Sequence, residues 1–180
     1  MNLVELRGEV RAVVDEAISM RRYLHRHPEL SGAEENTRAY ICERLKKWEI
    51  PYRICPTNKG IVADVGMGEP CIALRADIDA LPIEEKTGLP YASEHPGVMH
   101  ACGHDIHTAI LLTVGKVLKN REDSLKGTVR LLFQPAEETT GGAKDLCDSG
   151  VLTDYRVEAV FGLHLWPGLE SGRIFSRKNE

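Results

Sequence analysis

The sequence predicts an α/β fold, a three-layer sandwich in which a largely parallel, partly mixed sheet has helices on both faces. Segments with the three- and four-residue apolar spacing of helices alternate along the chain with short apolar runs bounded by Gly and Pro, which are typical of strands. This alternation favours helices packed over a sheet. Because no internal repeat, low-complexity tract or linker interrupts it, residues 1–180 are predicted to form one domain.

The first helix is expected over residues 3–26, where apolar residues recur at helical steps and form one stripe. Asn2 can cap its start, and Glu5 three residues later gives the spacing of a capping box. Pro28 disfavours helical geometry at the residue before it and so ends the helix nearby. These signals predict a long amphipathic helix at the start of the chain.

The remaining elements are expected to alternate. Ser31 and Glu34 have the spacing of a second capping box, which predicts a helix from Ser31 to about Trp48. Later segments show either helical spacing or the short apolar runs of strands. Strands are expected at residues 60–66, 71–76, 129–134 and 157–165, with one more beginning at 173–176, and helices at residues 108–118 and 143–149.

The composition is that of an ordinary globular protein, with 42% hydrophobic and 28% charged residues. A net charge of -4 gives no basic footprint for nucleic acid, and no stretch approaches the ~20 apolar residues of a membrane span. The N-terminus lacks the basic-then-apolar layout of a signal peptide. Five scattered cysteines fit reduced thiols better than a disulfide framework. We therefore expect a cytoplasmic protein with no nucleic-acid or membrane partner.

Residues 100–107 hold a dense group of metal-type donors: one thiol, three imidazoles and one carboxylate around a single glycine. Cys102 and His104, two residues apart, can place a sulfur and an imidazole nitrogen within reach of one cation. Mixed sulfur, nitrogen and oxygen donors favour a transition metal over magnesium or calcium. Taken alone, the same residues also fit a cysteine-containing loop beside surface histidines.

Donors from other segments are predicted to reach the same place. Five acidic or imidazole side chains lie at the carboxyl ends of the expected strands: Asp77, Asp79, Glu137, Glu138 and His164. In open α/β sheets, ligand sites gather beyond these strand ends. The loop with Cys102 and His104 leads into the N-terminus of the helix that comes after it. Four separate segments are thus expected to deliver donors to one edge of the sheet.

Each of these residues also has a simpler structural interpretation. Asp77 and Asp79 could cap turns, where Asx turns are common. Glu137 and Glu138 could be an ordinary exposed acidic pair. A lone histidine in an apolar strand, such as His164, is more often a satisfied core residue. The expected convergence of all of them with the cysteine–histidine loop favours metal ligation.

The adjacent glutamates suggest a division of labour beside a metal. In extended backbone, successive side chains point in opposite directions, so one glutamate can bind a metal while the other faces the reacting centre. A carboxylate beside a metal-bound water is suited to accept its proton, which is the chemistry of metal-assisted hydrolysis of an amide or ester. His100 and His107, which flank the metal loop, are candidates for holding a ligand in its orientation.

Five blocks of the chain, in this order, resemble the M20 metallopeptidases, and specifically their amidohydrolase branch of N-acyl-amino-acid, hippurate and auxin-conjugate hydrolases. The blocks are Arg22–Ser31, Leu74–Ile83, Met99–Thr108, Leu132–Glu138 and Gly162–Pro167. They span residues 22–167, so the resemblance extends over nearly the whole chain. The resemblance implies the catalytic domain of a zinc-peptidase-like fold and cleavage of an N-acyl amino acid, a small-molecule substrate.

The resemblance also implies roles for particular residues. The ligands of a two-metal site would be Cys102, His104, Glu138 and His164. Glu137 would be the general base for a metal-bound water, and Asp79 would orient a neighbouring ligand. The metals would be zinc or manganese, with nickel or cobalt as alternatives. Asp77 stands where peptidase branches have a histidine ligand, and its role is left unassigned.

The chain departs from the family pattern in its length. Family members have a lid or dimerisation domain inserted after the His-Leu-Trp-Pro region, then a final histidine ligand near the C-terminus. Residues 1–180 therefore resemble the catalytic domain up to that insertion. From this we expect exposed apolar surface and a free sheet edge, with low solubility or reliance on a complementing chain. A homo-oligomer is a further expectation.

Two other functions stay open at this point. A non-catalytic metal-binding or interaction protein derived from such an enzyme would keep the site without turnover, although the presence of Glu137 favours retained chemistry. A cysteine hydrolase would use Cys102 with a nearby histidine. Because a thiolate bound to metal is not a free nucleophile, activity that resists a chelator would be its signature.

Overall fold

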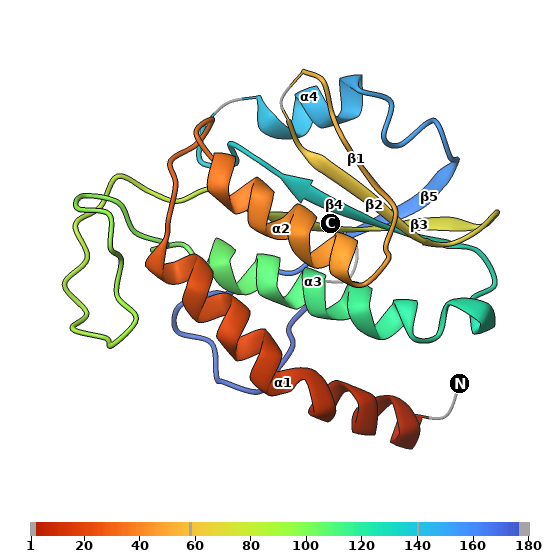
Figure 1. Cartoon of the computed structure of the whole chain (residues 1–180), viewed down its shortest axis with the longest axis horizontal. Helices are drawn as coiled ribbons and strands as arrows, with labels where there is room; N and C mark the ends of the chain where they lie inside the picture. The colour runs from red at the N-terminus through yellow and green to blue at the C-terminus, as the bar shows by residue number, and fades with distance from the viewer. Residues whose placement is uncertain (1–2, 58, 140, 177–180) are drawn as a thin grey trace.

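The computed structural model describes residues 3–57, 59–139 and 141–176, and its centre is a five-stranded sheet with helices on both faces (Figure 1). The helices are α1 (Leu3–Arg26), α2 (Glu35–Lys47), α3 (His104–Lys119), the short 3-10 helix η1 (Glu122–Ser124) and α4 (Gly142–Asp148). The strands are β1 (Tyr52–Ile54), β2 (Ile61–Gly66), β3 (Cys71–Asp77), β4 (Thr128–Gln134) and β5 (Val157–Gly162). The predicted three-layer α/β class is confirmed.

The sheet has the strand order β1-β2-β4-β3-β5 and is mixed. Strand β3 pairs in parallel with β4 on one side and with β5 on the other. Strand β2 runs antiparallel to both β4 and β1. Because β3, β4 and β5 run the same way, the segments that leave their carboxyl ends emerge at one edge of the sheet.

The core has two parts, one on each face of the sheet. On one face α2 and α3 pack their apolar sides against the sheet and α1 packs against α3, around side chains such as Leu24, Leu45 and Leu112. On the other face α4 contributes Leu146, which packs with Val62 of β2. Residues 61–63 of β2 are all buried, which is the pattern of a strand covered on both faces.

Strand β5 is an edge strand, and the segment after it is exposed. Phe161, Leu163 and Trp166 have 56%, 63% and 68% of their surface exposed. Among the described residues no strand pairs with the outer side of β5. The low solubility expected from this exposed apolar surface and free sheet edge stays a prediction.

The predicted second capping box is wrong, and both of its residues make long-range contacts instead. Helix α2 begins at Glu35, four residues later than expected. The Ser31 hydroxyl donates to Asp79 Oδ2 at 2.6 Å, and the buried Glu34 accepts the Ala136 N–H at 2.8 Å. The local spacing matched a cap, but tertiary contacts use both side chains to join the start of α2 to the segments after β3 and β4.

Other element boundaries differ from the expected ones by up to four residues. Helix α3 starts at His104, earlier than the expected 108, and strand β5 ends at Gly162 rather than 165. Residues 173–176 are irregular rather than a strand, and β1 was not expected. Asn2, the expected cap of α1, lies outside the described residues.

The five cysteines are free, as the scattered pattern predicted. In the part of the chain that the structure describes, no helix is both long and apolar enough to cross a membrane.

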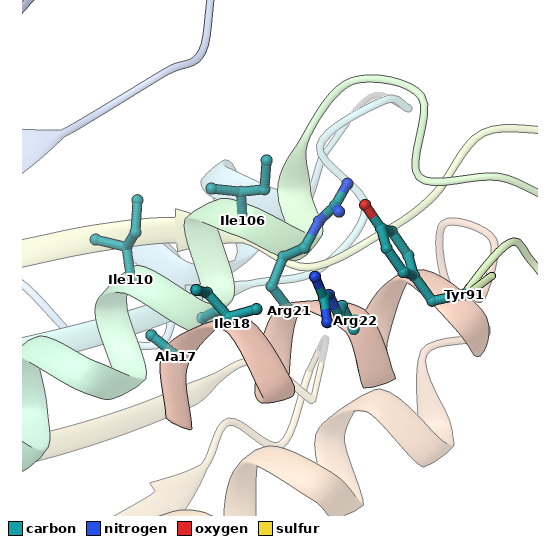
Figure 2. Close-up of a pocket in the computed structure, with 8 residues that line it drawn as sticks. Ala17, Ile18, Arg21, Arg22, Tyr91, Ile106 and Ile110 are labelled. Atoms are coloured by element: carbon teal, nitrogen blue, oxygen red, sulfur yellow. The ribbon is translucent and has the colours of Figure 1, made fainter. Parts of the chain in front are cut away.

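A cavity of about 440 Å³ lies between α1, α3 and Tyr91 (Figure 2). The guanidinium carbons of Arg21 and Arg22 lie 5.1 and 5.0 Å from the centroid of the Tyr91 ring, so both stack on it. Ile106 and the next turn of α3 complete the wall. At 3.6 residues per turn these positions face away from His104, so this cavity is separate from the predicted metal loop.

Candidate metal centre

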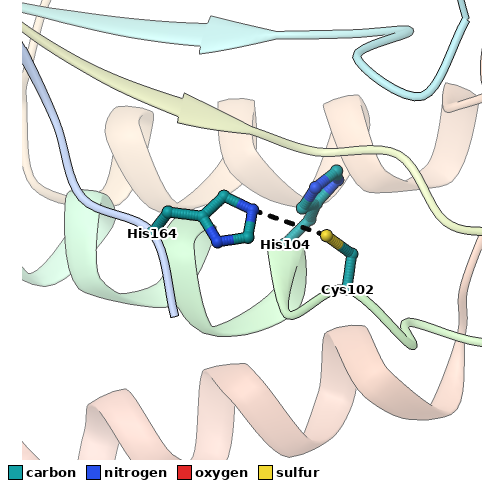
Figure 3. Close-up of side chains that lie close together, drawn as sticks. All are labelled: Cys102, His104 and His164. Carbon is teal, nitrogen blue, oxygen red and sulfur yellow. Dashed lines mark hydrogen bonds between the residues drawn. The ribbon is translucent and has the colours of Figure 1, made fainter. Parts of the chain in front are cut away.

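The structure brings the predicted donors together at the carboxyl edge of the parallel strands. One ligand atom from each of Cys102, His104 and His164 lies within 4.8 Å of the others, and the same holds for His104 with Glu137 and Glu138. Figure 3 shows Cys102 and His164 facing each other, with Sγ and Nε2 3.4 Å apart, and His104 beside them. The segments that meet here are the ones whose convergence the sequence predicted.

His104, the first residue of α3, is fully buried and has one ring nitrogen without a partner. Its Nδ1 donates to the Asp79 carbonyl at 2.9 Å and lies 3.2 Å from Asp79 Oδ1. This fixes the ring so that Nε2 has the free lone pair. Nε2 has no hydrogen-bond partner among the described residues, yet it lies 3.6 to 3.8 Å from carboxylate oxygens of Asp77, Glu137 and Glu138. A buried acceptor facing three acids fits a bound cation.

Asp79 connects three parts of the site. Its carboxylate contacts His104, and its Oδ2 accepts the Ser31 hydroxyl and the backbone N–H of Glu138 at 3.0 Å. Burial by itself raises the pKa of this carboxyl, but the hydrogen bonds from His104, Ser31 and the Glu138 backbone outweigh it and lower the pKa well below its ordinary value. Asp79 is therefore ionised, and its contacts fix the His104 ring.

The Cys102 thiol is half-buried next to acidic groups. Burial, followed by the nearby Glu138 carboxylate, raises the pKa of Cys102 to about 12. A free cysteine nucleophile needs a lowered pKa and a cationic neighbourhood. This environment therefore argues against a cysteine hydrolase and fits a thiol that loses its proton to a metal.

His164 lies on the exposed segment that comes after β5. Its Nδ1 donates to the Leu165 carbonyl, which leaves Nε2 facing Cys102. Ligating histidines commonly donate their second nitrogen to a backbone carbonyl. His104 and His164 thus each use Nδ1 on a carbonyl oxygen and present Nε2 to the same space.

The expected opposite orientation of Glu137 and Glu138 is wrong. Residues 137–139 form a bend rather than extended backbone, and Ala136 before them has a φ of 51°. Both carboxylates consequently reach His104 Nε2, at 3.8 Å for Glu137 and 3.7 Å for Glu138. Glu137 is the more exposed of the two, with 36% of its side chain accessible against 22%. The two glutamates therefore differ in exposure rather than in side-chain direction.

Sequence reasoning missed a buried polar network next to this site. His25, in the last turn of α1, contacts Asp105 Oδ2 at 2.8 Å through Nδ1 and Glu85 at 3.2 Å through Nε2. Arg21 also donates to Asp105 at 2.8 Å. The bond to Asp105 raises the pKa of His25, with Glu85 adding to it against the effect of burial. Only the spacing of Arg21 and His25 on one face of α1 could have indicated it.

His100 is buried, and neither of its ring nitrogens has a hydrogen-bond partner within the described residues. Burial lowers its pKa to about 4, so the ring is neutral. Within those residues, no hydrogen bond of its ring nitrogens supports the expected role of His100 in orienting a metal ligand.

Comparison with known proteins places these motifs in one group. Residues 73–178 match the model of Peptidase family M20/M25/M40. N-acetyl-L-cysteine deacetylase of Bacillus subtilis is 54% identical over 159 residues, which is 87% of this chain and 38% of that protein. N-acyl-L-amino acid amidohydrolase of Geobacillus stearothermophilus is 43% identical over 92% of this chain and 46% of its own length.

Two solved structures have the same fold over most of the chain. The YXEP protein of Bacillus subtilis, a dinuclear metal-binding peptidase of the M20 family, gives a TM-score of 0.83 with 48% identity, over 88% of this chain and 45% of that one. A protein of methicillin-resistant Staphylococcus aureus gives a TM-score of 0.92 with 40% identity, over 98% and 47%. The chain thus spans less than half the length of these relatives.

Proposed function

Because the chain belongs to peptidase family M20/M25/M40, we propose that it provides the metal centre of an amidohydrolase that cleaves N-acyl amino acids through a metal-activated water. The family predicted from the five motifs is confirmed. Relatives named for N-acetyl-L-cysteine and for N-acyl-L-amino acids support this substrate class. Since the chain spans less than half of their length, the activity of the whole protein is part of the proposal.

The proposed ligands of two divalent cations are Cys102, His104, Glu138 and His164. The single observation that supports them best is the buried His104 Nε2, which has no hydrogen-bond partner in the described part of the chain and lies within 3.8 Å of oxygens from three acidic residues. A thiolate with imidazoles leans toward zinc. The family resemblance leaves manganese open, with nickel or cobalt as alternatives.

A pair of divalent cations, when bound, supplies a polarised substrate carbonyl and a water that loses its proton near neutral pH. Glu137 is then the general base: its carboxylate lies at the site, is partly exposed, and can pass the proton to the leaving nitrogen. Asp79 holds the His104 ring from behind, as its hydrogen bonds indicate. Each role rests on contacts in this chain.

The test compares hydrolysis of N-acetyl-L-cysteine and of hippurate by the wild-type chain and by Glu137→Gln, with Zn²⁺ or Mn²⁺ added. Glu137→Gln keeps the size and should keep metal binding, but it should lower the rate by about 10²–10⁴-fold, the usual contribution of a general base. Asp123→Asn, on the exposed 3-10 helix η1, is the control for loss of one acidic group.

Three outcomes would contradict the proposal. Metal binding without hydrolysis in wild type would favour the non-catalytic metal-binding alternative for this chain. Hydrolysis that persists equally in Glu137→Gln would remove Glu137 from its role. Activity that resists a chelator would instead favour a cysteine nucleophile.

The cellular setting is also part of the proposal. Five free cysteines, without a disulfide, fit a reducing cytoplasm. The exposed edge of β5 fits self-association into a homo-oligomer. Sedimentation of the purified chain at two concentrations tests the second point, and a single monomeric species at both would contradict it.

A further inference from the structure

His164 is placed at the site by a segment with no regular structure of its own. Strand β5 ends at Gly162, and residues 163–165 are irregular and exposed. Even so, His164 Nε2 lies 3.4 Å from Cys102 Sγ. An exposed segment at a sheet edge is ordinarily mobile, so a contact outside the segment has to fix its backbone.

That contact is His107, one turn into α3. Its Nε2 accepts the backbone N–H of Leu165 at 3.1 Å. The His107 and His164 rings also lie against each other, with centroids 4.8 Å apart. Gly103 lets the segment approach closely, because a Cβ there would lie 3.1 Å from Leu165 Cδ1. The residue after His164 is therefore tied to the N-terminus of α3.

Asp77 sets the tautomer of His107 that this bond requires. Asp77 Oδ1 lies 2.6 Å from His107 Nδ1, and its Oδ2 accepts from Arg75 at 2.6 Å. A carboxylate paired with arginine only accepts, so the proton of His107 is on Nδ1 and the lone pair is on Nε2. Asp77 is fully buried and His107 is 5% exposed, so water does not compete for either contact.

The same geometry argues against His107 as a metal ligand. Asp77, His104 and His107 also form a compact group of donor atoms. Both nitrogens of His107 are already used, however, one by Asp77 and the other by Leu165. His107 therefore has no free lone pair for a cation.

We propose that Asp77 and His107 are a positioning pair: Asp77 fixes the tautomer of His107, and His107 holds the Leu165 backbone so that His164 stays opposite Cys102. The ligand role of His164 in this inference rests on the proposed function. The hydrogen bond from the Leu165 N–H to His107 does not depend on the proposed function. This assigns a role to Asp77 and deepens the one that the sequence suggested for His107.

The test uses two substitutions of His107, each of which keeps one of its two hydrogen-bonding groups. His107→Gln keeps an acceptor near the position of Nε2 and gives up the contact with Asp77. His107→Asn keeps a donor near Nδ1 and loses the acceptor for Leu165. His95→Asn, in a loop where the ring contacts the Pro28 carbonyl, is the control for loss of a histidine.

Two quantities are measured: hydrogen exchange of the Leu165 amide in the metal-free chain, and Zn²⁺ affinity by competition with a chelating dye. His107→Asn should speed the exchange about fivefold or more, the factor for one ordinary hydrogen bond. It should also weaken Zn²⁺ binding about 10–100-fold, as loss of a residue supporting a ligand does. His107→Gln should keep most of the protection of the Leu165 amide and most of the Zn²⁺ affinity. His95→Asn should change neither quantity.

Equal behaviour of the Gln and Asn variants, or rapid Leu165 exchange in the wild-type chain, would overturn the positioning pair. The exchange measurement needs neither metal nor substrate. If the wild-type chain binds no Zn²⁺ while the Leu165 amide still depends on His107, the bond between them stands and the proposed metal function fails. The two proposals can therefore fail separately.

Discussion

The two histidines that face Cys102 are held in opposite ways. His104 is fully buried at the start of α3, with its ring bonded to Asp79. His164 is exposed on an irregular segment, and its place depends on a backbone contact of the next residue and on ring contacts. One proposed ligand is thus buried within the fold, while the other is attached to it from outside.

This difference separates what a substitution does to folding from what it does to binding. Around His104, any change should reduce the free energy of unfolding and metal affinity together. Around His164, metal affinity should fall while the free energy of unfolding hardly changes. Substitutions in the two regions test that separation, beginning with the largest expected effect.

Replacement of Asp79 should have the largest effect. Asp79→Ala removes the acceptor for the Ser31 hydroxyl and the Glu138 N–H and takes away the charge beside His104. We expect a loss of about 3 kcal/mol in the free energy of unfolding, because a buried charged partner is removed, together with loss of metal binding. Urea unfolding and metal analysis measure both. Asp123→Ala, on η1, should stay within about 0.5 kcal/mol; a similarly small change for Asp79→Ala would contradict its central place.

Metal affinity should rise with pH. The pKa of Cys102 is raised to about 12 by burial and Glu138, and the pKa of His104 is raised because its hydrogen bond to Asp79 and the charge of Asp77 outweigh burial. At neutral pH the metal must therefore displace the proton of the Cys102 thiol. Below the raised pKa of His104 it must also displace a proton from that imidazole. Between pH 6 and pH 8 one displaced proton gives about a 100-fold gain in apparent Zn²⁺ affinity. A flat profile in a competition titration would show that the thiol is not a ligand.

Gly103 links the two regions, since it precedes His104 and lies against Leu165. Its φ of 110° is strained for any other residue, and a Cβ would press on Leu165. Gly103→Ala should cost about 1–3 kcal/mol of unfolding free energy and weaken metal binding. Gly32→Ala has a comparable φ of 81° with nothing within 4 Å of the new Cβ. It should therefore cost stability and leave Zn²⁺ affinity intact; equal affinity losses in the two variants would refute the contact with Leu165.

The smallest effect on folding is expected at His164. Because its side chain is exposed, His164→Ala should change the free energy of unfolding of the metal-free chain by less than about 0.5 kcal/mol. Zn²⁺ affinity should nevertheless fall by at least about tenfold, since a direct ligand matters no less than a supporting residue. Thermal unfolding with and without Zn²⁺ compares the two. A large loss of stability in the metal-free variant would place His164 in the core and end the contrast with His104.

The fold class and the meeting of Cys102, His104 and His164 could be predicted because both depend on regular patterns. Alternating periodicities indicate the layers, and parallel strands bring their ends together. The roles of Ser31 and Glu34 could not be predicted, because their spacing matches a local cap while their partners, Asp79 and Ala136, are distant in sequence.

The orientation of Glu137 and Glu138 was wrong for a related reason. Alternation applies to extended backbone, and a single residue of positive φ at Ala136 changes the direction of the residues after it. The contact of His107 with Leu165 is also invisible in the sequence, since it joins an α3 side chain to a backbone N–H at the sheet edge. Sequence patterns thus located the site but not the contacts that hold it together.

X-ray absorption at the zinc edge of the loaded chain tests the central claim, that Cys102, His104 and His164 bind one divalent cation, most directly. The expected spectrum has a sulfur at about 2.3 Å and nitrogens at about 2.0–2.1 Å. Cys102→Ser should abolish the sulfur shell, and His164→Ala should reduce the nitrogen shell. A spectrum with oxygen and nitrogen alone, unchanged by both substitutions, would contradict the claim.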